Sequence, residues 1–290
     1  MRLVTFERAG HGPEPGLLLA EGVAGAGALG FPNMLDLIER WTVARPIIEQ
    51  HALGAKAAAI PLHEVHLLAP IPRPRKLICV GLNYRDHAIE SGMEIPKIPT
   101  IFNKFATSVI GPGAAVVLPR NSQQADYEAE FAFVVGTGGR NIRRQDWGSH
   151  VFGYTMVNDV SARDIQLATS QWLMGKTFDT FAPIGPAIVT QDEISDPHSL
   201  NISLRITDAA GNCQTLQNSN TRELIFKIPD LIEFLSSVFT LEPGDIVSTG
   251  TPSGVGFARK PPRYLQPGDD VVVSVEHLGE LRNPVVAATL

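Results

Sequence analysis

The sequence predicts a mainly β protein of the α+β class, with its strands arranged as a sandwich or roll. Short apolar, strand-like runs recur along most of the chain, and Pro and Gly cluster between them. Helical patterns are few, and they do not alternate regularly with strands as in a parallel α/β sheet. Of the 290 residues, 44% are hydrophobic and 19% are charged, a composition typical of a globular protein.

The first 70 residues predict a small α/β domain. Its expected elements are two strands of a hairpin and one helix, over 3–6, 16–20 and 33–48. Asn33 is a suitable N-cap for that helix because its side chain can accept a backbone N–H. Prolines at alternate positions over 70–74 then predict a stiff, extended connector. We therefore expect a small N-terminal domain over 1–70 and a larger domain over 71–290.

The larger part of the chain predicts many strands and few helices. Strands are expected over 76–80, 100–103, 115–118, 128–135, 151–158, 187–189, 200–207, 214–218, 245–248, 270–275 and 281–286. Helices are expected over 84–92, 161–173 and 221–237.

Composition excludes several classes of protein. The net charge is −6 and no basic run occurs, so nothing indicates binding to nucleic acid or to an anionic membrane surface. No apolar stretch reaches the ~18–20 residues that a membrane helix requires. The N-terminal residues carry charges where a signal peptide needs an apolar run. Two distant cysteines, Cys79 and Cys213, exclude a four-cysteine zinc site. We expect a cytoplasmic enzyme.

The most informative segment is acidic. In a strand over 128–135, Glu128 and Glu130 share one face because side chains alternate with period two. Two buried neighbouring carboxylates repel each other unless one is protonated or a cation lies between them. Asp159, at the end of the next apolar run, supplies a third carboxylate. An all-oxygen set suits Mg²⁺, Mn²⁺ or Ca²⁺. The alternative is a solvated strand face.

Other residues have the chemistry of a catalytic site. His87 and Glu90 would be neighbours on a helix, where a carboxylate orients an imidazole as a general base. Lys176 is a lone cation in an apolar, aromatic setting, suited to stabilising an oxyanion. Arg163 and Gln166 lie one helical turn apart, and arginine can grip a carboxylate with two N–H groups. The alternatives are an incidental surface pair, a surface lysine and an ordinary salt bridge.

The segment 248–256 is rich in glycine and hydroxyl residues and follows a predicted strand. Its backbone N–H groups are suited to holding an anion. It does not have the Gly-Lys-Ser/Thr ending of a phosphate-binding P-loop. The alternative is a tight loop without a ligand.

Five ordered segments together resemble the fumarylacetoacetate hydrolase family. The resemblance runs over about 74–288 and is carried by 81–87 (GLNYRDH), 126–130 (DYEAE), 158–164 (NDVSARD), 175–183 (GKTFDTFAP) and 249–256 (TGTPSGVG). It is greatest to the fumarylacetoacetate hydrolase domain-containing proteins, and the segment 259–265 looks like their second branch. The resemblance implies a mixed β-roll around a Mg²⁺ or Mn²⁺ site.

The resemblance also implies roles for single residues. It implies metal ligands at Glu128, Glu130 and Asp159, and catalytic roles for His87, Glu90 and Lys176. It further implies substrate contacts from Tyr84, Arg163, Gln166 and Thr251. A homodimer is implied in the same way.

These inferences together predict a metal-dependent hydrolase that cleaves a C–C bond in a 2,4-diketo acid such as an acylpyruvate, in the catabolism of aromatic compounds or sugar acids. The alternatives on the same metal site are an oxaloacetate decarboxylase or tautomerase and a 2-hydroxy-dienoate isomerase. A non-catalytic metal-binding protein is a further alternative. Its discriminating feature is the pair His87 and Glu90, because a purely structural metal needs no base beside it.

Overall fold

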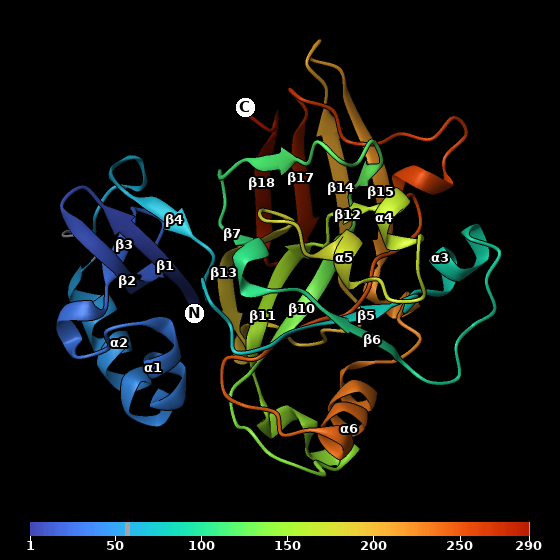
Figure 1. Ribbon diagram of the computed structural model, residues 1–290. Coiled ribbons are helices and arrows are strands. Elements are labelled where there is room, and N and C mark those ends of the chain that lie inside the picture. Colours follow the sequence, from blue (N-terminus) through green and yellow to red (C-terminus); the bar gives the residue numbers. More distant parts are fainter. Residues whose placement is uncertain (56–58, 290) are drawn as a thin grey trace.

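The computed structural model describes residues 1–55 and 59–289, and its framework is one large mixed sheet (Figure 1). Eleven strands of the described chain form this sheet. From edge to edge they are β3 (Val23–Gly25), β2 (His11–Leu18), β1 (Arg2–Arg8), β13 (Ala182–Thr190), β11 (Val151–Asn158), β10 (Ala129–Val135), β16 (Ile246–Ser248), β5 (Leu77–Gly81) and β6 (Thr100–Asn103). In addition, β4 (His66–Leu68) pairs with β1 and β7 (Val109–Ile110) pairs with β13.

A second sheet packs against the middle of the first. Its order is β15 (Cys213–Asn220), β14 (Asn201–Thr207), β17 (Asp270–Val275), β18 (Gly279–Ala287) and β8 (Val116–Leu118). The main hydrophobic core lies between the two sheets, where Phe131 and Phe133 of β10 meet Leu204 of β14 and Val273 of β17. A short pair, β9 (Ala125–Asp126) with β12 (Ser161–Ala162), lies beside them.

The helices lie around these sheets (Figure 1). They are α1 (Met34–Glu39), α2 (Trp41–Ala55), α3 (Arg85–Glu90), α4 (Arg163–Gln166), α5 (Leu173–Lys176) and α6 (Ile228–Val238). The predicted fold class, mainly β with few helices, is confirmed.

One local prediction is confirmed, one predicted helix is divided in two, and another is wrong. Asn33 is the N-cap of α1, and its Oδ1 accepts the Asp36 N–H at 3.0 Å. The helix predicted over 33–48 is divided at Arg40 into α1 and α2. The helix predicted over 161–173 is wrong, because its first residues form β12, which pairs with β9, and only the short α4 and the start of α5 are helical.

The two predicted domains share the large sheet. Leu3 of β1 pairs with Ile188 of β13, so strands from the first 70 residues extend the sheet that carries the later strands. The Thr5 hydroxyl donates to the Pro70 carbonyl at 2.6 Å, which joins β1 to the Pro-rich connector. The division of the chain at residue 70 stays a prediction.

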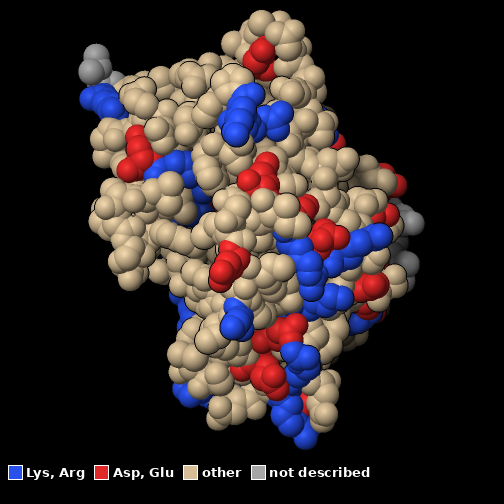
Figure 2. All heavy atoms as spheres, turned by 90° about the vertical axis from the view of Figure 1, so that its right-hand side faces the viewer, with Lys and Arg blue, Asp and Glu red and all other residues tan. Residues whose placement is uncertain are grey.

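The outer surface carries both signs of charge. In Figure 2, which shows one face, Lys and Arg side chains are interspersed with Asp and Glu. No helix within the described ranges is long and apolar enough to span a membrane.

Candidate active site

Three carboxylates meet where β10 and β11 approach each other. Ala129 pairs with Asn158 across these strands, so the flanking Glu128 and Asp159 lie side by side. The Asp159 N–H donates to the Glu128 carbonyl at 2.9 Å. Glu130 shares a face with Glu128 because strand side chains alternate. One oxygen from each carboxylate lies within 4.8 Å of the others, and all three residues are buried.

Buried cations offset part of this negative charge. The Lys176 ammonium donates to Oε2 of Glu128 at 2.8 Å and to Oδ2 of Asp159 at 2.7 Å. The Lys104 ammonium donates to the other Asp159 oxygen at 2.5 Å and to the Val160 carbonyl at 3.0 Å. Burial lowers the Lys176 pKa, but the charges of Asp159 and Glu128 outweigh burial, and the pKa is raised. Lys176 therefore stays charged.

Glu128 and Glu130 have opposite electrostatic environments. Burial raises the Glu128 pKa, but the charges of Lys176 and Arg163 outweigh it, and the pKa lies well below the usual range. Burial, followed by the charges of Asp159 and Glu128, raises the Glu130 pKa well above its usual value. Glu130 Oε2 accepts from the Ser248 hydroxyl at 2.5 Å and from the Gly250 N–H at 3.0 Å. Ionised Glu130 is the carboxylate with the least cationic compensation.

The donor set fits a hard divalent cation. Each of Glu128, Glu130 and Asp159 can offer a carboxylate oxygen to one point, and oxygen ligands suit Mg²⁺, Mn²⁺ and Ca²⁺. Burial and the charges of Asp159 and Glu128 raise the Glu130 pKa. A cation between the carboxylates would relieve the repulsion among them.

The predicted histidine–glutamate pair forms on α3. His87 Nδ1 lies 3.5 Å from Glu90 Oε2, and His87 lines the cavity beside the carboxylates. Both Glu90 oxygens accept the Gly254 N–H at 2.9 Å. Burial raises the Glu90 pKa, but the hydrogen bonds from His87 and Gly254 outweigh it, and the pKa is lowered. Glu90 is thus an ionised partner that can orient the His87 ring.

Arg163 and Gln166 of α4 also face the cavity. Arg163 Nη1 donates to Gln166 Oε1 at 3.0 Å, and Arg163 Nε donates to Asp126 Oδ2 at 2.9 Å. Arg163 Nη2 lies 2.6 Å from Glu128 Oε1, but this ion pair does not have the alignment of a hydrogen bond. The buried Nη2 group therefore retains N–H capacity for a ligand.

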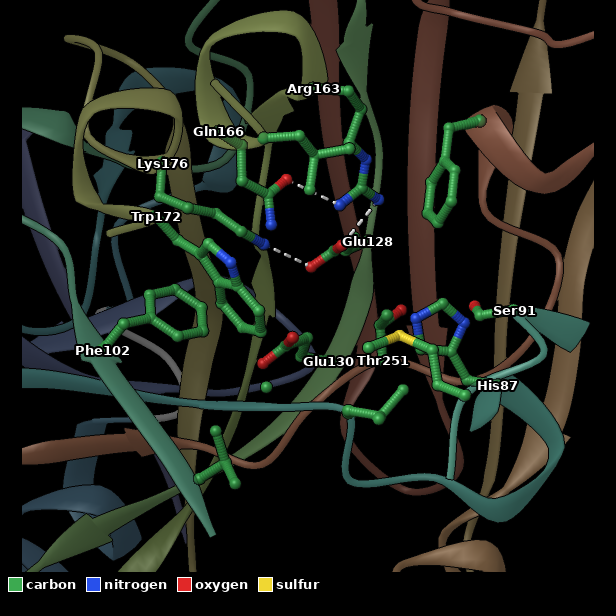
Figure 3. A pocket seen from close by; sticks show the side chains of 16 residues that line it. His87, Ser91, Phe102, Glu128, Glu130, Arg163, Gln166, Trp172, Lys176 and Thr251 are labelled. Atoms are coloured by element: carbon green, nitrogen blue, oxygen red, sulfur yellow. Dashed lines mark hydrogen bonds and ion pairs between the residues drawn. The ribbon is translucent and has the colours of Figure 1, made fainter. Parts of the chain in front are cut away.

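The cavity has a volume of about 100 Å³, which is below the ~300 Å³ at which pockets for drug-sized ligands begin. Trp172 and Phe102 form one side of it, His87 and Thr251 lie opposite, and Glu128 lies between these sides (Figure 3). An apolar and aromatic wall thus faces polar groups across a small space.

Two predicted substrate contacts differ in position. Thr251 lines the cavity, and its Oγ1 accepts from Gln217 Nε2 at 2.8 Å, which leaves its own O–H free to donate. Tyr84 does not line the cavity. It is fully buried at the start of α3, where its backbone bridges to Leu224. A substrate contact from Tyr84 has no support from this geometry.

The glycine-rich segment binds anions that belong to the protein itself. Three of its backbone N–H groups donate hydrogen bonds to buried or half-buried carboxylates. The pairs are Gly250 to Glu130, Gly254 to Glu90 and Gly256 to Asp126. The predicted anions are thus carboxylates of the protein at all three glycines. These N–H groups hold the carboxylates that surround the cavity.

Sequence reasoning missed Lys104 and the role of Asp126. Lys104 follows β6 directly, and its only sequence signal is a single cation after an apolar strand. Asp126 precedes Glu128 by two residues and is completely buried, but its partners come from α4 and from 256–257, which no local pattern links to it.

Comparison with known proteins shows the family. The model of the family described as "Fumarylacetoacetate (FAA) hydrolase C-terminal" matches residues 76–286. The chain belongs to the fumarylacetoacetate hydrolase family. Among curated relatives, the mitochondrial oxaloacetate tautomerase Fahd2a of Rattus norvegicus is 45% identical over 295 residues, which cover 99% of this chain and 92% of the relative. The mitochondrial oxaloacetate tautomerase fahd2 of Xenopus laevis is 50% identical over 237 residues, which cover 81% and 73% of the two chains.

Solved structures of the family have the same fold. The fumarylacetoacetate hydrolase of Exiguobacterium antarcticum superimposes with a TM-score of 0.84 at 34% identity, covering 99% of this chain and all of that one. Maleylpyruvate hydrolase from Sphingobium sp. SYK-6, in complex with manganese(II) and pyruvate, has a TM-score of 0.83 at 32% identity over the full length of both.

The comparisons bear on two earlier predictions. The likeness to the second branch of the domain-containing proteins is confirmed by the tautomerase relatives. The prediction of a cytoplasmic protein is wrong by this comparison, since the rat and frog relatives are both named as mitochondrial.

Proposed function

We propose that this protein is a divalent-metal-dependent tautomerase that interconverts the keto and enol forms of oxaloacetate or a similar small 2-keto dicarboxylic acid. The observation that carries the proposal is the buried set of Glu128, Glu130 and Asp159, of which the two glutamates line a small cavity that His87 also lines. Relatives that are 45–50% identical and named oxaloacetate tautomerases support the choice of reaction.

Glu128, Glu130 and Asp159 would hold Mg²⁺ or Mn²⁺. A bound ion of this kind acts as a Lewis acid on a 2-keto oxygen. Lys176 uses two of its three N–H bonds on Glu128 and Asp159, and the third can donate to the oxygen that becomes negative.

The remaining side chains bind the substrate and move the proton. Arg163 and Gln166 would hold the distal carboxylate, because Arg163 Nη2 retains a buried N–H. His87, oriented by Glu90, would take the proton from C3. The C–H electron pair then forms the C2–C3 double bond, and the carbonyl π pair moves to the oxygen, which takes a proton. The aromatic wall of Trp172 and Phe102 limits access of water.

A second candidate is hydrolysis of a C–C bond in an acylpyruvate, the reaction that the sequence predicts. The specific observation that favours it is the His87–Glu90 pair, since an oriented imidazole can also activate water. The likeness to a maleylpyruvate hydrolase is compatible with this chemistry. A non-catalytic role is disfavoured by the same pair.

The test uses metal-stripped protein supplied with Mg²⁺ and with enol-oxaloacetate, acetylpyruvate or fumarylpyruvate. We expect loss of the enol absorbance of oxaloacetate without release of pyruvate. We expect His87→Gln to lower kcat by about 100-fold or more. His63→Gln, in an exposed histidine, is the control and should leave the rate unchanged.

Other outcomes point to the alternatives. Two acids from an acylpyruvate would establish the hydrolase, and pyruvate from oxaloacetate would establish the decarboxylase. Equal enol decay with and without protein would contradict tautomerase activity.

A further inference from the structure

Asp126 is a completely buried carboxylate that touches neither the cavity nor the carboxylate oxygens assigned to the metal. Its Oδ1 accepts from the Tyr127 N–H at 2.8 Å and the Gly256 N–H at 2.7 Å. Its Oδ2 accepts from the Phe257 N–H at 3.0 Å and from Arg163 Nε at 2.9 Å. Four donors from three separate segments therefore converge on one side chain.

The partners of Asp126 also contact each other. The Arg163 guanidinium lies over the Phe257 ring, 4.5 Å from its centroid. Asp126 thus fixes one edge of the guanidinium, and the Phe257 ring fixes its plane. Phe257 belongs to the turn 254–257, and the same turn holds Asp126 through its backbone N–H groups. A guanidinium held at one edge and on one face has its remaining N–H groups aimed in one direction.

The glycines of this turn are required by how closely it approaches its partners. A Cβ at Gly256 would lie 2.5 Å from Asp126 Oδ1 and 2.0 Å from the Arg263 carbonyl oxygen. A Cβ at Gly254 would lie 2.1 Å from the Leu216 carbonyl oxygen, and its φ is +99°. Side chains at these positions would push the backbone N–H groups away from Asp126 and Glu90.

The turn therefore links the two sides of the site. Gly254 holds Glu90 and so the base His87, while Gly256 and Phe257 hold Asp126 and so the cation Arg163. We propose that Asp126, held in place by residues 254–257, is a positioning residue that aims the Arg163 N–H groups at the distal carboxylate of the substrate. The inference rests on the proposed function, in which Arg163 binds that carboxylate.

Asp126 and Glu128 compete for the Arg163 guanidinium, and this competition predicts how loss of Asp126 changes ligand binding. Without the Asp126 charge, the nearest carboxylate to Arg163 is that of Glu128, which already lies 2.6 Å from Nη2. The guanidinium should then rotate toward Glu128 and away from the ligand. Asp126→Asn preserves the shape of the side chain but removes its charge and places an amide N–H₂ against two donors, either the Phe257 N–H with Arg163 Nε or the N–H groups of Tyr127 and Gly256.

The experiment measures ligand preference and does not depend on turnover. Mg²⁺-loaded protein is titrated by calorimetry with difluorooxaloacetate, a 2-keto dicarboxylate with no hydrogen at C3, and with pyruvate, a 2-keto monocarboxylate. We expect the wild type to prefer the dicarboxylate. Asp126→Asn should weaken the dicarboxylate by about tenfold or more, as loss of a charge-assisted hydrogen bond does, and leave pyruvate within about twofold.

Two further variants separate positioning from general damage. Phe257→Leu removes the stacking face and should reduce the preference in the same direction without altering Asp126. Asp164→Asn is the matched control, because the Asp164 carboxylate accepts from Ser122 and Gln123, whereas the guanidinium donates to Asp126 and Gln166. In an Arg163→Met background, Asp126→Asn should have no further effect on the preference.

The outcomes distinguish this inference from the proposed function. Equal weakening of both ligands by Asp126→Asn, or an unchanged preference in a folded variant, would overturn the positioning role while tautomerase activity could still be measured. A wild type with no preference for the dicarboxylate would overturn the role of Arg163, and this inference with it.

Discussion

The chemistry of the cavity depends on an incomplete balance of buried charge. Four carboxylates, those of Asp126, Glu128, Glu130 and Asp159, face three cations, Lys104, Lys176 and Arg163. Two of these carboxylates have strong cationic partners on both oxygens, whereas Glu130 has hydroxyl and backbone donors on one. The residual negative charge is thus concentrated where a divalent cation would bind.

Glu130→Gln should have opposite effects on stability and on metal binding. Burial and its acidic neighbours raise the Glu130 pKa, so the ionised side chain destabilises the metal-free fold above the usual carboxyl pKa. The neutral variant should therefore melt higher by about 2 °C or more without metal. Its Mg²⁺ affinity should fall by about 100-fold or more, measured by calorimetry.

Glu233→Gln, at an exposed position on α6, serves as the control and should change neither quantity. A metal-free Glu130→Gln protein that melts lower than the wild type would contradict this charge balance.

Lys104→Met should destabilise the metal-free protein. The substitution keeps the buried aliphatic stem but leaves Asp159 Oδ1 without its cation. Removing one partner of a buried pair costs roughly 3 kcal/mol, which chemical denaturation can measure. Saturating Mg²⁺ should recover more stability in this variant than in the wild type. Lys97→Met, at an exposed position, is the control; an equal loss in both variants would show that Lys104 has no special role.

At the scale of elements, the alternation of side chains along one strand predicted part of the site. Local sequence patterns could not predict the residues that other segments contribute. Alternation correctly placed Glu128 and Glu130 on one face and Phe131 and Phe133 on the other. Asp159 joins them through the pairing of β10 with β11, which the sequence suggests only through the order of its segments. Lys104 and Asp126 were beyond local reasoning, because their partners, apart from the Tyr127 N–H that Asp126 accepts, are more than thirty residues away.

The short helices show the other limit of sequence reasoning. The pattern over 161–173 suggests a helix, yet the chain forms β12 and α4 there. Pairing of Ser161 with Asp126 outweighs helix propensity, and this pairing brings Arg163 next to Asp126. A single long helix would separate those two side chains.

The link between α3 and the 254–257 turn predicts an acid-dependent contribution to stability. Burial raises the Glu90 pKa, but hydrogen bonds from His87 and Gly254 lower it below its usual 4.5 overall. A lowered pKa stabilises the fold above the unfolded-state value, and this contribution is lost as pH falls through the folded-state value. The stability difference between wild type and Glu90→Gln should thus be constant above pH 4.5 and shrink below it.

Denaturant unfolding of both proteins across this pH range measures that difference. Titration of other carboxylates cancels between the two proteins. A difference that grows as the solution becomes more acidic would contradict the role of Glu90.

At the scale of the whole molecule, the N-terminal strands and the active-site strands belong to one sheet. Strand β1 lies between β2 and β13, and β13 leads through β11 to β10. The N-terminal amine also binds Thr190 Oγ1 at 2.6 Å, just beyond the paired segment. The predicted boundary near residue 70 therefore divides the sequence, but the hydrogen-bonded sheet continues across it.

A protein limited to residues 71–290 should accordingly be unstable or aggregate. Removing β1 exposes the backbone of β13 as a new edge strand, and exposed edges promote pairing between molecules. Size-exclusion chromatography and thermal melting would measure this. A monodisperse fragment that melts with the full chain would instead support an independent domain over 71–290.

The measurement that tests the central claim most directly is a Mg²⁺ titration of metal-stripped protein in which binding and turnover of enol-oxaloacetate are followed together. We predict that turnover is absent without metal, that it rises in proportion to occupancy of one site, and that Glu128→Gln abolishes both binding and turnover. Full turnover in the presence of a chelator, or in the Glu128→Gln variant, would contradict a metal site formed by Glu128, Glu130 and Asp159.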